Sequence, residues 1–215
     1  MFTPVTPELA AELLKGLGFG DGLIKKAALT LAELAEPQFT GGYFALEEKE
    51  GGTGLKGTSL ILTGKDIKNR LSGCDECYMF ALTLGRRVDA FIERSGVSGL
   101  LEGYAVDTLA GYYADMLAEE IQAEVGKKAA EKGRFVTERF SPGYGDLPLQ
   151  SQEGILTALG ADKILKIVLT EGGMMTPFKS ITAIMGISDV PSGQKPERCA
   201  NCPKKNLCKG AVCGD

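Results

Sequence analysis

The segment Arg139–Pro148 reads RFSPGYGDLP, and the elements expected on either side of it are arranged around this turn. Upstream, residues 133–139 (GRFVTER) alternate β-branched or aromatic residues with polar ones, which predicts a strand. A proline and two glycines within residues 142–145 then interrupt regular structure, because glycine permits positive φ angles. Such a turn beside Arg139 suits a carboxylate or phosphate, although the pattern also fits an ordinary strand-to-helix loop.

Composition excludes several function classes. The 215 residues contain no histidine, which removes histidine-based general acid–base catalysis, Ser–His nucleophiles and the usual catalytic zinc sites. The formal net charge of -4 gives no basic excess for nucleic acid. No apolar run is long enough to span a membrane, and Met1–Gly20 carries prolines and acids instead of a signal-peptide pattern. We therefore expect a cytoplasmic protein.

Mixed helical and strand periodicity predicts the fold class. Helices are expected from Thr6 to about Gly16 and at residues 21–35, 64–71, 86–95, 99–132 and 149–159. Strands are expected at residues 39–48, 58–62, 77–84, 133–139, 164–170 and 180–187, with a glycine-rich loop at 51–57. Because these elements do not follow a strict βαβ repeat, we expect an α+β fold with a mixed, mainly antiparallel twisted sheet flanked by helices.

Two late loops are candidates for one groove. Arg139–Pro148 follows one expected strand, and Glu171–Pro177 follows another. Residues 1–189 are expected to form the folded domain that holds these loops, and residues 190–215 a linker with a cysteine-rich tail.

An ordered set of motifs resembles a known family. The set comprises Arg139-x-x-x-Gly143-Tyr144-x-x-x-Pro148, Leu169-Thr170-Glu171, Met174, Pro177 and Ser180, preceded by Thr83-Leu84-Gly85 and Asp107-Thr108-Leu109-Ala110. It resembles the activation domain of cobalamin-dependent methionine synthase over about residues 83–188, roughly half of the chain. That domain binds S-adenosylmethionine and presents its methyl group to cob(II)alamin during reductive reactivation.

The resemblance implies roles for particular residues. Arg139 would hold the carboxylate of S-adenosylmethionine, and the Gly143–Tyr144 turn would supply backbone contacts. Asp115 or Glu119 would be the acid on the long helix near the ligand, and Glu171 lies in the second matching loop.

Two departures from the family pattern bear on the ligand. Gly145 stands where the family turn usually continues with proline, and Ile184 and Met185 stand where the family has paired tyrosines. Losing both aromatic side chains removes stacking and hydroxyl contacts if they touched the ligand.

Six cysteines form two groups. Cys199, Cys202, Cys208 and Cys213 follow the spacing C-x2-C-x5-C-x4-C, which favours one metal centre in a cytoplasmic chain over disulfides. We expect an iron–sulfur cluster, with structural zinc as the alternative. Cys74 and Cys77 form a separate C-x-x-C that fits small buried cysteines, a redox pair or added ligands to the tail centre.

The combined hypothesis is a stand-alone reactivation or accessory protein for a corrinoid-dependent methyltransferase. The cobalamin would be bound on a partner, because this chain lacks the histidine of an Asp-x-His-x-x-Gly motif. Whether the chain is itself an enzyme stays open. The alternative is a non-catalytic module that docks on a methyltransferase or corrinoid protein, has lost S-adenosylmethionine and uses its tail as a structural metal clip. An independent small-molecule methyltransferase would lack an obvious general base.

Overall fold

The structure, a computed structural model, describes residues 2–98 and 100–191. The helices are α1 (Pro7–Leu13), α2 (Asp21–Leu34), α3 (Lys65–Arg70), α4 (Arg86–Ser98), α5 (Leu100–Ala130), α6 (Ser151–Leu159) and α7 (Ala161–Ile164). The strands are β1 (Gln38–Lys49), β2 (Gly52–Leu55), β3 (Ile61–Leu62), β4 (Glu76–Thr83), β5 (Phe135–Val136), β6 (Val168–Leu169), β7 (Met175–Thr176) and β8 (Ser180–Ser188). No helix in these two ranges is both long and apolar enough to cross a membrane.

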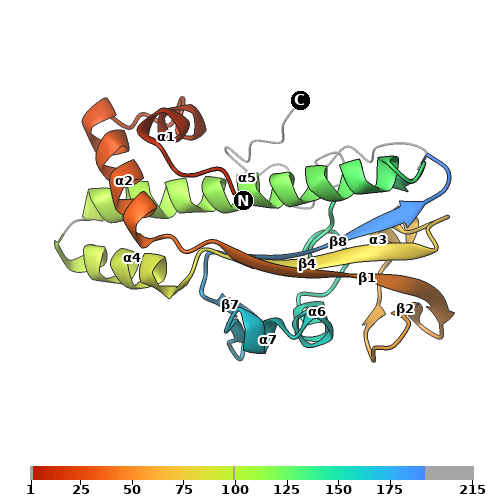
Figure 1. The fold of residues 1–215 in the computed structure, drawn as a ribbon. Coiled ribbons are helices and arrows are strands. Elements are labelled where there is room, and N and C mark those ends of the chain that lie inside the picture. The colour runs from red at the N-terminus through yellow and green to blue at the C-terminus, as the bar shows by residue number, and fades with distance from the viewer. Residues whose placement is uncertain (1, 99, 192–215) are drawn as a thin grey trace. The chain divides into compact units, whose positions relative to one another are not determined.

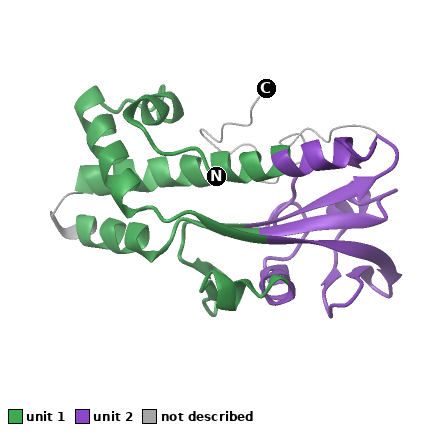
Figure 2. Ribbon diagram, in the orientation of Figure 1, with its two compact units in different colours: residues 1–40, 81–123, 159–181 green, residues 41–80, 124–158, 182–215 purple. Residues whose placement is uncertain are grey.

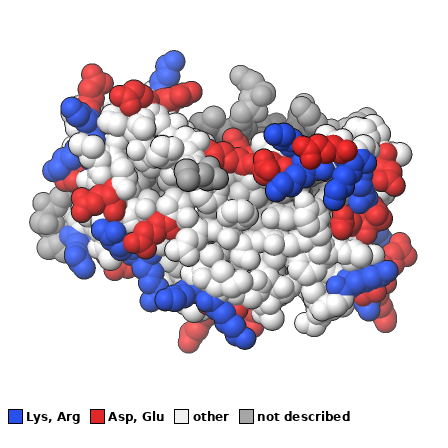
Figure 3. Space-filling view, viewed as in Figure 1, with Lys and Arg blue, Asp and Glu red and all other residues white. Residues whose placement is uncertain are grey.

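The main sheet has six strands in the order β3-β2-β1-β4-β8-β5, and β6 and β7 form a separate two-stranded sheet (Figure 1). The pairs β1–β2, β2–β3, β5–β8 and β6–β7 are antiparallel. The prediction of an α+β fold with a mainly antiparallel sheet flanked by helices is confirmed. On the face drawn in Figure 3, basic and acidic side chains lie interspersed.

The chain divides into two compact units, each built from three separate segments (Figure 2). Unit 1 comprises Met1–Thr40, Ala81–Ala123 and Leu159–Ile181, and unit 2 comprises Gly41–Phe80, Glu124–Ala158 and Thr182–Asp215. The domain boundary expected near residue 190 lies where the described residues end, so it stays a prediction.

Unit 1 begins with two packed helices, α1 and α2. Thr6 caps α1 as predicted: its side-chain oxygen accepts a hydrogen bond from the Leu9 N–H at 3.2 Å. Helix α2 buries one stripe, formed by Ile24, Ala27, Ala28 and Leu31. Burial of such a stripe supplies most of the stability of a helix of this length.

Unit 2 contains a three-stranded meander, in which β1 pairs with β2 and β2 with β3. The N-terminal part of β4 belongs to this unit and is almost wholly buried, with Cys77, Met79 and Phe80 fully inaccessible. This burial confirms the strand expected at residues 77–84. Each large apolar side chain buried there contributes roughly 1.5–3 kcal/mol to stability.

Arg134 anchors the segment that leads into the candidate turn. Its guanidinium contacts Asp75, Glu76 at 3.2 Å and Asp189 at 2.9 Å, and only 18% of its side chain is exposed. Because these acids lie at the beginning of β4 and just after β8, the arginine links the residue before β5 to the ends of both strands, and β5 itself pairs with β8.

Three sequence-based expectations were wrong in detail. The glycine-rich residues 51–57, expected to be a loop, contain β2; a side chain at Gly52 would run into the carbonyl of Leu62, so glycine permits the close strand pairing. The strand expected at 164–170 shrinks to Val168–Leu169, because α7 occupies Ala161–Ile164. The strand expected at 133–139 is limited to Phe135–Val136.

Candidate functional site

Within the turn at residues 139–148, several backbone N–H groups donate hydrogen bonds to carbonyl oxygens of the same turn. Gly143 has a φ of 87° and donates its N–H to Leu147 C=O at 2.9 Å. Tyr144 donates its N–H to Ser141 C=O at 3.1 Å. The backbone contacts expected from Gly143 and Tyr144 therefore cannot come from these two amides without breaking the turn. Its exposed groups include the Tyr144 ring, which is 66% accessible.

Asp146 ties this turn to helix α3. One carboxylate oxygen accepts from Lys65 N–H at 2.6 Å and the other from Asp66 N–H at 3.0 Å. These hydrogen bonds hold the pKa of Asp146 below its ordinary value, because they stabilise the charged form. They also satisfy two of the amides that a helix N-terminus leaves without intrahelical partners.

The packing of the turn against α3 explains why glycine stands at position 145. Gly145 has a φ of 52°, and a Cβ added there would overlap the Asp66 carboxylate. Across the same contact, a Cβ on Gly64 would lie 2.5 Å from the Asp146 carboxylate. Proline at 145 is excluded, because its ring fixes φ near about −65°. Glycine at position 145, where the family usually has proline, therefore permits the close contact between the turn and α3.

Arg139 precedes a backbone connection to β8. Phe140 and Ile184 exchange hydrogen bonds at 2.9 Å in both directions, forming an isolated antiparallel bridge. The Arg70 guanidinium lies 5.1 Å from the centre of the Phe140 ring and donates to Glu138 C=O at 3.3 Å. These contacts hold the backbone on both sides of the half-buried Arg139.

The six predicted ligand-binding residues fall into two sets. Arg139, Gly143 and Tyr144 belong to unit 2 and lie within one continuous segment. Asp115 and Glu119 are exposed one turn apart on α5, and Glu171 is exposed in the turn between β6 and β7; all three belong to unit 1. The grouping of the two sets in one site stays a prediction.

Ile184 and Met185, which replace the family's tyrosines, are completely buried on β8. Consecutive residues of a strand point to opposite faces, so the protein covers both faces of β8 at this position. Neither side chain is accessible to a ligand in this structure.

The Thr83-Leu84-Gly85 motif has a structural role. Thr83 Oγ1 accepts from Gly85 N–H at 3.1 Å and from Ser180 Oγ at 2.8 Å. Leu84 N–H donates to Lys179 C=O at 2.9 Å. The amides of Leu84 and Gly85 are therefore already bonded within unit 1. The matching Ser180 belongs to this hydrogen-bond network.

The two described cysteines, Cys74 and Cys77, are poorly suited to act as nucleophiles. Burial raises the pKa of Cys77 to about 12, and burial likewise raises the pKa of Cys74. The described part of the chain contains no cluster of three or more cysteine or acidic side chains placed to hold a metal. The predicted ligands Cys199, Cys202, Cys208 and Cys213 lie outside the described residues.

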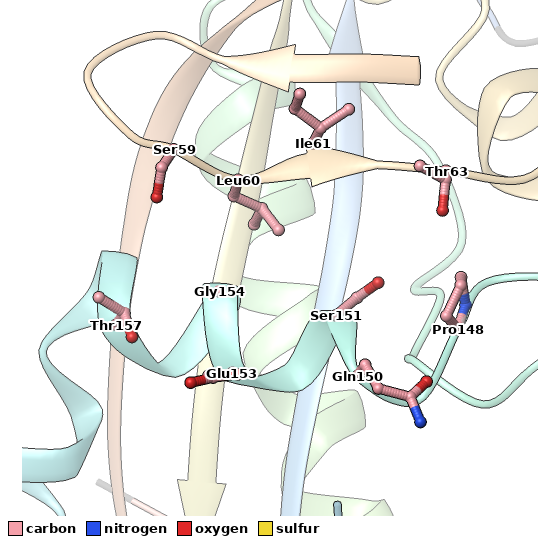
Figure 4. A pocket seen from close by; sticks show the side chains of 10 residues that line it. All are labelled: Ser59, Leu60, Ile61, Thr63, Pro148, Gln150, Ser151, Glu153, Gly154 and Thr157. Carbon is pink, nitrogen blue, oxygen red and sulfur yellow. The ribbon is translucent and has the colours of Figure 1, made fainter. Parts of the chain in front are cut away.

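Sequence reasoning missed a groove in unit 2. The groove has a volume of about 480 Å³ and lies between β3 and α6 (Figure 4). Ten residues line it: Ser59, Leu60, Ile61, Thr63, Pro148, Gln150, Ser151, Glu153, Gly154 and Thr157. Half of them carry polar, uncharged side chains. Its polar residues are scattered over two expected elements, so no sequence spacing marked them. Only Pro148 belonged to a motif.

Comparison with known proteins supports the fold. No family model matches the chain. A crystal structure described as the MetH reactivation domain bound to AdoHcy superposes with a TM-score of 0.59 at 17% identity, covering 83% of this chain. The present chain spans 65% of that chain's length. An adenine phosphoribosyltransferase of Marinomonas sp. (strain MWYL1) is 27% identical over 168 residues, covering 70% of this chain and 92% of the relative. The structural similarity establishes that this chain has the reactivation-domain fold, the one that the motif resemblance implied.

Proposed function

We propose that this chain is a stand-alone reactivation or accessory protein for a corrinoid-dependent methyltransferase. The observation that carries the proposal is the fold similarity to the MetH reactivation domain, over 83% of this chain. That structure contains AdoHcy, the product left when S-adenosylmethionine gives up its methyl group. Such a protein needs little acid–base chemistry, which suits a chain without histidine.

S-adenosylmethionine is the proposed ligand of the turn at residues 139–148. Arg139 would hold its carboxylate, since a guanidinium can donate two parallel hydrogen bonds. Because the amides of Gly143 and Tyr144 are used within the turn, these residues would contribute carbonyl oxygens and the exposed Tyr144 ring. Asp115 or Glu119, together with Glu171, would orient the positively charged part of the ligand. When bound, S-adenosylmethionine supplies the methyl group for the partner's corrinoid.

The tail would complete this function as an electron donor. Cys199, Cys202, Cys208 and Cys213 would hold an iron–sulfur cluster, with zinc as the alternative. A cluster supplies single electrons, as reductive methylation of Co(II) requires, whereas zinc has no redox chemistry. Iron and sulfide analysis of anaerobically purified protein distinguishes the two. Replacement of all four cysteines by serine should abolish visible absorbance and leave the folded domain intact.

The function is tested by methyl transfer to a separate corrinoid protein. We expect anaerobic mixtures containing the protein, a reductant, S-adenosylmethionine and a Co(II) corrinoid protein to form methylcobalamin. Omission of this protein is the first control, and the four-serine tail variant is the second. No methylcobalamin above the first control would contradict the proposal.

One observation favours a second candidate function. Ile184 and Met185 are fully buried, so the positions that carry paired tyrosines in the family do not reach a ligand. A non-catalytic module that docks on a methyltransferase or corrinoid protein, with its tail as a structural metal clip, would need no S-adenosylmethionine. Retained affinity for S-adenosylmethionine separates the two candidates.

A further inference from the structure

In the part of the chain that the structure describes, one side of the β3 backbone has no partner strand, because β3 lies at the edge of the six-stranded sheet. Leu55 N–H donates to Leu60 C=O at 3.3 Å, and Gly54 stands opposite Ile61. Hydrogen-bonding residues alternate along an antiparallel strand, so Leu60 and Leu62 bond toward β2 while Ile61 directs its N–H and C=O away from it. Within residues 2–98 and 100–191, no strand pairs with this outward side of Ile61.

Helix α6 forms the second wall of the groove along this edge. In Figure 4, Thr157 lies toward the end that contains Ser59, and Pro148 toward the end that contains Thr63. The walls meet at Gly154, where an added Cβ would lie 2.6 Å from the Leu60 side chain. Glycine weakens a helix relative to alanine, and here it lets α6 approach the strand.

One end of the groove is held by a contact already described. Asp146 binds the N–H of Lys65, two residues after Thr63. Asp146 itself precedes Pro148 by two residues. The hydrogen bond therefore joins the two walls near one end, and the groove is a preformed feature of unit 2.

The lining defines the chemistry of an occupant. Glu153 is the only charged side chain among the ten lining residues, and it forms no ion pair with any described residue. The side chain of Ile61 is 40% exposed and points away from α6 (Figure 4). The unpaired N–H and C=O groups of the edge strand can hydrogen-bond to alternating amide acceptors and donors, which the backbone of an extended peptide supplies.

We propose that the groove between β3 and α6 binds an extended segment of a partner protein, which adds as a strand beside Ile61 and places a lysine or arginine against Glu153. At about 3.4 Å per residue, the part of the β3 wall from Ile61 to Thr63, beyond the contact of Leu60 with Gly154, accommodates two or three residues of such a segment. The site concerns docking and does not depend on S-adenosylmethionine, so it stands whether or not the chain takes part in methyl transfer.

The test uses a phage-displayed library of random dodecapeptides, selected against the immobilised full-length protein. We expect enriched peptides to contain lysine or arginine and few acids. Ile61→Pro removes the outward N–H without breaking a native hydrogen bond and should weaken peptide binding about tenfold, while Ile61→Val keeps the N–H and the affinity. Glu153→Lys, on the exposed side of α6, should remove binding of the basic peptides without affecting folding.

Amide spectra of the ¹⁵N-labelled protein locate the bound peptide. Binding in the groove should shift the Ile61 and Thr63 amides first. Selection that enriches no peptide overturns the proposal. So do peptides that bind wild type, Ile61→Pro and Glu153→Lys equally well, or peptides whose binding shifts only amides outside the groove.

Discussion

The carboxylate of Asp146 accepts a hydrogen bond from the backbone N–H of Lys65 at 2.6 Å, across 81 positions of sequence. Together with the hydrogen bond from Asp66 N–H at 3.0 Å, it joins the candidate ligand-binding turn to the start of α3. A Cβ on Gly64 would meet the Asp146 carboxylate and a Cβ on Gly145 the Asp66 carboxylate, so glycine at both positions permits this close approach. Several consequences can be measured.

Asp146→Asn should lower the melting temperature near neutral pH and have little effect in acid. The pKa of Asp146 is lowered in the folded protein, so its charged form favours folding. This contribution is fully present above the unfolded value of about 4 and is lost as the pH falls through the lowered folded value. Thermal melts of both proteins at a series of pH values test this. Asp162→Asn, at an exposed position on α7, is the control and should show no such convergence.

Gly145→Ala should destabilise the protein by about 1–2 kcal/mol, because alanine is strained at a positive φ. The overlap with Asp66 adds less, since that carboxylate can rotate away. Gly126→Ala is the matched control: it lies inside α5 with open space around it and should stabilise by up to about 1 kcal/mol. Urea unfolding measures both changes. Equal effects of the two variants would show that the turn is not held as described.

Ile184→Tyr should destabilise the protein by about 1–3 kcal/mol, because a larger side chain must be fitted into a filled core. It should not raise affinity for S-adenosylmethionine, since position 184 is fully buried. Ile61→Tyr, at a partly exposed position, is the control for stability. A stable Ile184→Tyr variant with tighter ligand binding would mean that β8 is accessible to the ligand after all.

Cys77 should resist thiol reagents until the protein unfolds. With a pKa of about 12, only about one part in ten thousand is thiolate at pH 8. The measurement uses the four-serine tail variant, so that Cys74 and Cys77 alone react with Ellman's reagent. We expect Cys74 to react slowly and Cys77 only in denaturant. Rapid native reaction of both thiols would support a redox pair instead.

The sequence predicted best where one local signal dominated. The apolar run at residues 77–84 and the last strand at 180–187 are long and strongly patterned, and both exist almost as expected. The Thr6 cap is equally local. The prediction of a loop at the glycine-rich residues 51–57 was wrong, because glycine there permits close strand pairing and does not break the strand.

The candidate site was predictable only in part. Motif order led to the correct fold and to the turn after Arg139. The hydrogen bonds that occupy the Gly143 and Tyr144 amides depend on chain geometry, and sequence spacing does not report them. The contact between Asp146 and α3 joins residues far apart in the chain, as does the groove between β3 and α6. No local pattern marks such contacts.

The most direct test of the central claim is calorimetric titration of the anaerobically purified protein with S-adenosylmethionine, beside Arg139→Ala. We predict saturable binding to the wild type and at least about tenfold weaker binding to the variant, because one charge-assisted contact is lost. Unchanged thermal stability of the variant without ligand would show that the loss concerns binding. Absence of heat and of thermal stabilisation by the ligand in the wild type would contradict the account, and the fold would then serve as a docking module.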